Sequence, residues 1–404
     1  MTGRRLTRTE AQVQTRAKVL VAARAEFTER GYRDATVDSI ADRAYLTRGA
    51  VYSNFTGKRA LYFSVLADLA ERSRTPVVEP GTTRAEALAA FAGAWLDWLV
   101  ESGEDADLER GGYRLGAGLA TEVLADDETP GQYAQLMKLN AILLGLALER
   151  LRPANRERRV DGDPGMGELG RLQAGVDQVG QVGAGRLVRL AEVVLSTLHG
   201  AGQLTAAAPG FVQPFTIAKA CAQLASLELN DRWQRPPTLP PVRPDNEAWT
   251  PPPVIDALRS TPARLGPDGL FVVLGLNRLA AAEDAVRAVT LGTPVTVALV
   301  SSRPAELGPL ARLTVAELAG CLRQAFPSAA MPELQLVHDE SGGFATAAGV
   351  EVIGNDLEFA IRVSGGRIVA RSEGFGAGHA VALAEVSTRR GSAAATETTD
   401  ISSF

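Results

Sequence analysis

A proline-rich segment divides this chain into two parts with different hydrophobic patterns. Ten of the 22 prolines of the 404-residue sequence lie between residues 235 and 267. Such a stretch is stiff and extended, because proline fixes φ and lacks a backbone N–H. From Thr82 to about Asn230 apolar residues recur at helical spacing, whereas residues 268–388 contain short β-branched runs between helical ones. We therefore expect a linker at 235–267, crossed by few contacts, between a helical part and an α/β part.

Charge is distributed unevenly along the chain. The net charge is -5, but residues 1–75 contain 14 Lys and Arg against 8 Asp and Glu, so this segment carries +6 and the remainder -11. The overall balance would argue against nucleic acid as a partner. A basic head on an acidic body indicates instead a DNA-binding module with a separate sensing or assembly body. A basic N-terminus that is merely solvated is the alternative.

The stretch from Thr36 to Lys58 predicts two short helices joined by a tight turn. Thr36 and Thr47 each stand where a hydroxyl caps a helix. The second helix, Arg48 to Asn54, presents short, polar and basic side chains without an acid, as a helix in a DNA major groove requires. Lys58 begins a further helix and is placed to touch a phosphate; an ordinary exposed lysine is the alternative. The expected DNA contacts are Thr36, Thr47, Arg48, Gly49, Ala50, Tyr52, Ser53, Asn54 and Lys58.

Three linked segments, residues 16–32, 34–41 and 49–61, resemble in order and spacing the DNA-binding domain of the tetracycline-repressor (TetR) family. One departure is Tyr45, which stands where family members usually have glycine. Because glycine tolerates positive φ more easily than tyrosine, we expect a slightly recast turn. The resemblance implies a homodimer that binds a palindromic double-stranded DNA operator, acts as a repressor, and is released by an unidentified small-molecule effector.

The same resemblance assigns residues 76–234 to ligand binding and dimerisation. The last two predicted helices, Arg186–Gln203 and Phe211–Trp233, would form the dimer interface; packing inside one subunit is the alternative. An aromatic stripe on an earlier helix either packs in the core or lines an effector cavity. The candidate ligand-binding residues are Phe91, Trp95, Trp98, Tyr113, Tyr133 and Met137.

Residues 268–388 resemble a thioredoxin/peroxiredoxin fold in their order of strands and helices. A redox member of that fold needs a cysteine just after the first central strand, but this chain has Ser301, Ser302 and Arg303 there. Cys321 comes well inside the following helix, and residues 355–358 contain no proline where such folds usually have a cis-proline. We therefore expect a thioredoxin-like domain without redox cysteines, followed by a disordered tail at 389–404.

The remaining signals exclude several classes of function. The two cysteines are a hundred residues apart and the three histidines are scattered, so neither a disulfide framework nor a metal centre is expected. No catalytic motif, signal peptide or apolar run of about 18 residues is visible. We therefore expect no enzyme activity, no cofactor, no membrane partner and a cytoplasmic location.

The sequence thus predicts a multidomain chain: an all-α helix-turn-helix head (1–75), a helical regulatory body (76–234), a linker (235–267), an α/β thioredoxin-like domain (268–388) and a tail (389–404). The predicted function is that of a homodimeric, ligand-responsive transcriptional regulator, most simply a repressor. Two alternatives stay open at this point. One is a redox sensor or thiol-dependent enzyme working through the C-terminal domain, and the other is an interaction protein with a vestigial head.

Overall fold

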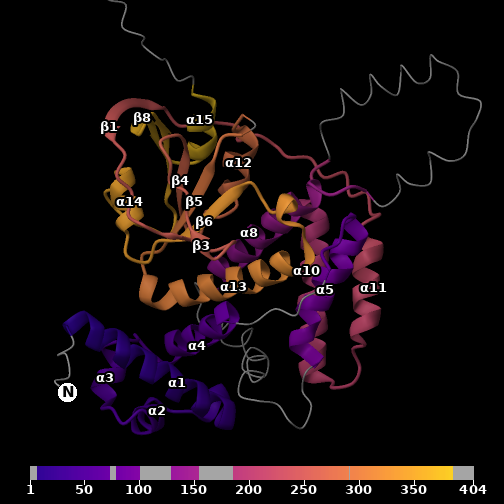
Figure 1. The fold of residues 1–404 in the computed structure, drawn as a ribbon, viewed down its shortest axis with the longest axis vertical. Coiled ribbons are helices and arrows are strands. Elements are labelled where there is room, and N and C mark those ends of the chain that lie inside the picture. The colour runs from indigo at the N-terminus through magenta and orange to yellow at the C-terminus, as the bar shows by residue number, and fades with distance from the viewer. Residues whose placement is uncertain (1–6, 73–78, 101–128, 154–184, 291, 385–404) are drawn as a thin grey trace, which may run out of the picture.

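The computed structural model describes residues 7–72, 79–100, 129–153, 185–290 and 292–384. Its elements form a helical head, a helical body and a six-stranded sheet with helices on both faces (Figure 1). The predicted tail at 389–404 lies outside the described residues. In the part of the chain that is described, no helix is long and apolar enough to cross a membrane.

The head consists of α1 (Arg8–Asp34), α2 (Val37–Arg43), α3 (Arg48–Tyr52) and α4 (Lys58–Arg72). Local signals set the helix starts: Thr7, Thr36 and Thr47 each accept a hydrogen bond from a first-turn amide of the helix that follows. The apolar faces of the four helices meet in one core. Its largest buried side chains include Phe27, Ile40, Leu61, Tyr62 and Phe63.

The body consists of α5 (Arg84–Val100), α8 (Thr129–Glu149), α10 (Val188–Ala207) and α11 (Pro214–Leu224). The last helix is shorter than the predicted Phe211–Trp233, which is a correction. After Leu224 the chain leaves the helix, and Asn230 has a φ of 46°. The Asp231 carboxylate accepts from the Arg189 amide at the start of α10 (2.7 Å) and pairs with Arg186. The chain around Asp231 is therefore held against the start of α10 and does not continue the helix α11.

The sheet has the strand order β1-β8-β7-β4-β5-β6. The strands β4 (Gly269–Gly275), β5 (Val295–Val300) and β6 (Leu334–His338) run parallel, and β7 (Glu358–Ser364) is antiparallel to β4. The predicted hairpin is present, with β8 (Arg367–Glu373) following β7 across Gly365 and Gly366. The remaining helices are α12 (Ala281–Ala288), α13 (Pro304–Ala325), α14 (Gly343–Ala348) and α15 (Ala377–Leu383), with a short 3-10 turn at Ser328–Ala330.

Alternate residues of β4 face two different cores, because successive strand side chains point to opposite sides of a sheet. Leu270, Val272 and Leu274 belong to the core that contains α12, α13 and α15. Phe271 and Val273 pack on the other face with α14 and Trp249. A sheet-containing C-terminal domain is therefore present as predicted. Its resemblance to the thioredoxin fold stays a prediction.

The proline-rich segment is part of the folded structure, which corrects the expectation of a linker at 235–267. Strand β1 (Arg243–Ala248) pairs antiparallel with β8 at the edge of the sheet, where proline is tolerated because one side of an edge strand needs no ladder bonds. Two shorter strands, β2 (Ile255–Asp256) and β3 (Thr261–Pro262), pair with each other. Trp249 is buried, with its ring 4.8 Å from that of Phe271.

Helix α13 connects the three parts of the molecule. It packs against α4 of the head, against α5 and α8 of the body, and under the sheet (Figure 1). Arg59 of α4 pairs with Glu306, Arg312 bonds the Glu71 carboxylate at 2.8 and 2.7 Å, and Asn140 of α8 donates to the Thr314 carbonyl at 3.0 Å. The expectation that few contacts cross between the helical part and the α/β part is therefore wrong, because α13 buries apolar surface of both.

Candidate nucleic-acid interface

The turn between α2 and α3 keeps a positive φ despite its tyrosine. Tyr45 has a φ of 56° and its side chain is 95% exposed. The turn closes through the Tyr45 amide, which donates to the Asp42 carbonyl (3.0 Å), and the Leu46 amide, which donates to the Ala41 carbonyl (2.9 Å). Tyrosine thus adopts the left-handed conformation that glycine usually supplies, at a cost of roughly 1–2 kcal/mol. The positive φ at Tyr45 therefore gives no sign of a recast turn.

Helix α3 presents the polar surface that the sequence predicts. Val51 is buried against the head, and the Thr47 hydroxyl accepts from the Ala50 amide at 3.2 Å. The exposed side chains include Arg48 and Tyr52, the latter 44% exposed. Thr47, Gly49 and Ser53 are exposed as well, whereas Ala50 and Asn54 are half-buried. Short side chains around one arginine and one tyrosine suit close approach to base edges.

Arg48 has two neighbours that the sequence reading did not place beside it. Its guanidinium lies 3.2 Å from the Asp38 carboxylate of α2 and 5.4 Å from the centre of the Tyr52 ring. The acid-free face of α3 is therefore bordered by an acid from the preceding helix. Because the Arg48–Asp38 pair is solvent-exposed, water and salt screen it and it adds little stability. A phosphate or a guanine can replace Asp38 at little cost.

Three predicted contact residues also have structural roles. Thr36 and Ser39 form a reciprocal cap at the start of α2. The Lys58 ammonium donates to the carbonyls of Arg33 (3.1 Å) and Ala35 (2.8 Å) and lies 4.5 Å from the Tyr32 ring. It thereby caps the carboxyl end of α1, where a positive charge is favourable. The side-chain amide of Asn54, two residues after the end of α3, donates to the Ala50 carbonyl at 2.9 Å.

Sequence reasoning missed Arg16, which ties α1 to α3. Its guanidinium lies 4.3 Å from the centre of the Phe55 ring and donates to the Asn54 carbonyl at 3.0 Å, next to the end of α3. Burial lowers the pKa of Arg16. The only signal in the sequence was its place in the first segment of the family resemblance. Arg16 thus positions the end of α3 against α1.

The predicted ligand-binding residues Phe91 and Trp95 of α5 pack against other side chains. The Phe91 ring is fully buried, 6.4 Å from Phe326 at the end of α13, and Trp95 stacks on it at 6.2 Å. Trp95 also contacts His199, whose pKa is lowered to about 4 by burial. These contacts favour core packing for Phe91 and Trp95. Tyr113 and the side chain of Trp98 lie outside the described residues.

Tyr133 and Met137 are on α8 and are half-buried. Burial raises the pKa of Tyr133, and the nearby Glu317 of α13 raises it further. The pKa of Glu317 itself is raised to about 7 by burial. These side chains are therefore at the junction between the body and α13, and their role in ligand binding stays a prediction.

The two last helices of the body bear both buried and exposed apolar residues. Much of the apolar face of α10 is buried, because Leu190, Val194, Leu195 and Leu198 pack inside the subunit. Phe211, between α10 and α11, is 71% exposed, and Phe215, in the first turn of α11, is 70% exposed. Val193, Leu204 and Leu227 are exposed too. These exposed apolar side chains make the two helices a candidate for the predicted dimer interface, which stays a prediction.

Comparison with known proteins bears on the head. Residues 19–65, which run from the middle of α1 into α4, match the family model for bacterial regulatory proteins of the tetR family. The head is therefore of the TetR type. The match covers both helices of the helix-turn-helix and the turn with Tyr45.

Relatives of this TetR-type head are transcriptional regulators. The HTH-type transcriptional regulator UidR of Escherichia coli (strain K12) is 27% identical over 166 residues, which are 41% of this chain and 78% of that protein. The HTH-type transcriptional regulator SrpR of Pseudomonas putida is 46% identical over 63 residues, 16% of this chain and 29% of that protein. Together with the family model they support a helix-turn-helix transcriptional regulator of the TetR family, a class of proteins that are not enzymes.

A solved TetR-family regulator from Pectobacterium atrosepticum is similar over 55% of this chain and 96% of its own, with 20% identity and a TM-score of 0.31.

Proposed function

We propose that this protein is a ligand-responsive repressor that binds a palindromic DNA operator as a homodimer. The observation that carries the proposal is α3, a short helix with an exposed Arg48 and Tyr52 on a TetR-type head. Two such helices related by a two-fold axis enter successive major grooves, about 34–36 Å apart. The exposed Phe211 and Phe215 are our candidates for the centre of the dimer interface.

Release from DNA requires a link between the body and the head. Helix α4 carries that link, since it begins directly after the helix-turn-helix and packs along α13. An effector that binds one arrangement of α13 and α4 more tightly than the other shifts the dimer toward that arrangement. A changed spacing of the two α3 helices then lowers the affinity for the operator.

A redox function is not proposed. Cys221 and Cys321 are both buried, and burial raises the pKa of the Cys221 thiol to about 11. The thiolate is the reactive form of cysteine, so a raised pKa disfavours reaction at neutral pH.

The test is footprinting on DNA that flanks the protein's own gene, with the wild type and two arginine variants. We expect protection of a palindrome whose half-sites are about 10 base pairs apart. Arg48→Ala should need a higher protein concentration for the same protection, while Arg232→Ala, a change at an exposed arginine outside the head, should protect as the wild type does. Absence of protection by the wild type, or equal protection by Arg48→Ala, would reject the proposal.

A further inference from the structure

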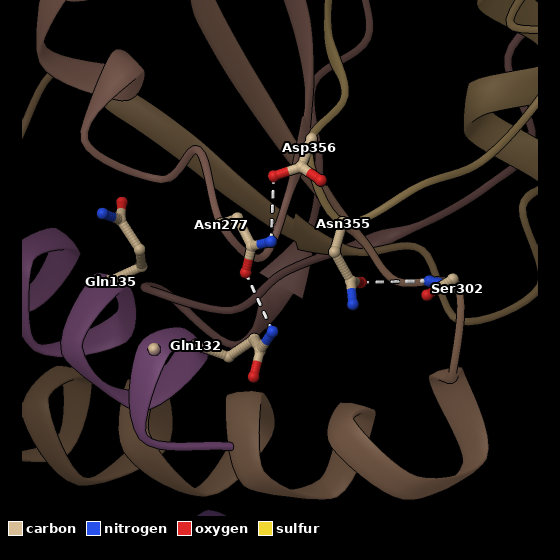
Figure 2. A pocket seen from close by; sticks show the side chains of 7 residues that line it. Gln132, Gln135, Asn277, Ser302, Asn355 and Asp356 are labelled. Atoms are coloured by element: carbon tan, nitrogen blue, oxygen red, sulfur yellow. Dashed lines mark hydrogen bonds between the residues drawn. The ribbon is translucent and has the colours of Figure 1, made fainter. Parts of the chain in front are cut away.

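A polar cavity of about 640 Å³ lies where the body meets the sheet. Helix α8 contributes Gly131, Gln132 and Gln135 to its wall. Figure 2 shows the side chains of Gln132 and Gln135. The loops after β4 and β5 and the loop before β7 supply the other side. The cavity thus lies outside the carboxyl ends of parallel strands, where open α/β sheets bind their ligands, and its volume is typical of a small-molecule site.

The side chains of the wall are held in place by hydrogen bonds to one another. The Gln132 amide donates to the Asn277 side-chain oxygen at 2.9 Å, and the Asn277 amide donates to the Asp356 carboxylate at 2.9 Å (Figure 2). The Asn355 side-chain oxygen accepts from the Ser302 backbone amide at 3.1 Å. A wall preorganised in this way costs a ligand little ordering entropy.

Gln132 has hydrogen-bonding capacity that the protein does not use. It is 5% exposed, and its side-chain oxygen has no hydrogen-bond partner in the described structure. This oxygen is enclosed by protein atoms, so the group that Gln132 offers a ligand is its amide, which carries two N–H donors and uses one of them toward Asn277.

The wall defines the chemistry of the ligand. Its described residues include four carboxamides, one hydroxyl and one carboxylate, and no lysine or arginine is among them. Carboxamides both donate and accept, whereas Asp356 only accepts, so an anion is disfavoured. Hydroxyl groups, which also donate and accept, complement such a wall. We propose that this cavity binds a neutral polyhydroxy molecule, a mono- or disaccharide or a polyol.

The cavity connects to the head through α13. Ser302, at the rim, comes two residues before the start of that helix. Glu306, in the first turn of α13, pairs with Arg59 at the start of α4, and Arg312 bonds Glu71 near the end of α4. A ligand that shifts Ser302 therefore shifts a helix that is fastened to α4 at two points. The site deepens the proposed function by naming its effector class, and only the effect on DNA rests on that proposal.

The experiment is isothermal titration of the full chain, without DNA, with glucose, galactose, sucrose, maltose and sorbitol. Glucose 6-phosphate and putrescine serve as charged probes. We expect saturable binding of at least one neutral probe. Gln132→Leu, which is close in size and removes the side-chain amide, should weaken it about tenfold, as the loss of one hydrogen bond predicts. Gln135→Leu should weaken it as well, and thermal melting establishes that each variant is folded.

The matched control is Gln234→Leu, the same change at an exposed glutamine outside the cavity, which should leave binding unchanged. The proposal is overturned if no neutral probe binds, if only a charged probe binds, or if both cavity variants bind a neutral probe as the wild type does. Footprinting separates the two proposals. Sugar binding without an operator would reject the regulator and keep the site, whereas an operator without sugar binding would reject the site alone.

Discussion

Replacing Tyr45 with glycine should stabilise the helix-turn-helix. The tyrosine has a φ of 56° and is 95% exposed, so glycine relieves the left-handed strain without removing packing. The relief is roughly 1–2 kcal/mol, and the greater conformational freedom of glycine in the unfolded chain offsets roughly 0.5–1 kcal/mol of it. The net expectation is about 0.5–1 kcal/mol in favour of the variant.

The measurement is native-state hydrogen exchange of the Leu46 amide, which donates to the Ala41 carbonyl across the turn. Protection of this amide should rise about 2- to 5-fold, since 1.36 kcal/mol corresponds to a factor of ten. The matched control is Tyr52→Gly, the same substitution inside α3, where glycine should cost about 1 kcal/mol. Lower protection in Tyr45→Gly would refute the assignment of strain to this turn. Weaker operator binding together with higher protection would assign Tyr45 a contact with DNA.

Four further expectations follow from particular contacts. Arg48→Ala and Tyr52→Ala should each weaken operator binding by about 1–3 kcal/mol in fluorescence anisotropy at fixed salt; equal affinity in both would contradict the assignment of α3. Arg312→Met breaks the pair with Glu71. A bound effector changes the affinity for the second site about 5–150-fold in allosteric proteins, and in this variant the factor for operator affinity should be close to one. Arg72→Met, which breaks the exposed pair with Asp68 within α4, should not bring it close to one. Because the folded-state pKa of Glu317 is raised from 4.5 to about 7, the folded state binds the extra proton, and its stability falls as pH rises through this window. In urea titrations the free energy of unfolding of Glu317→Gln minus that of wild type should therefore increase as pH rises from 4.5 to 7. A constant difference across that range would contradict the pKa shift. Removing residues 235–404 should yield an insoluble or unfolded product by size-exclusion chromatography and circular dichroism, because α13 covers apolar residues of α4 and α5; a soluble, helical dimer would show that the head and the body fold without it.

Cys221 and Cys321 show what their positions in the sequence can predict and what they cannot. The separation of Cys321 from the start of α13 was evident from the chain alone, because about 1.5 Å per helical residue places it far from Ser301. Their burial, which decides their reactivity, was not evident. Likewise, an aromatic stripe containing Phe91 and Trp95 was consistent with a core or a cavity wall until the neighbouring Phe326 and His199 were known.

The sequence by itself determined the local elements. Thr36 and Thr47 mark helix starts, and Gly365–Gly366 places the hairpin. Ile40 on α2 and Val51 on α3 are apolar residues on the buried faces of their helices. These signals act between residues a few positions apart, so they can be read along the chain. Only the tertiary structure decided that β1 joins the sheet and that α13 packs on α4. It alone brought Gln132 to Asn277, 145 residues away. Such contacts depend on which apolar faces cover one another, and a face of suitable spacing does not specify its partner.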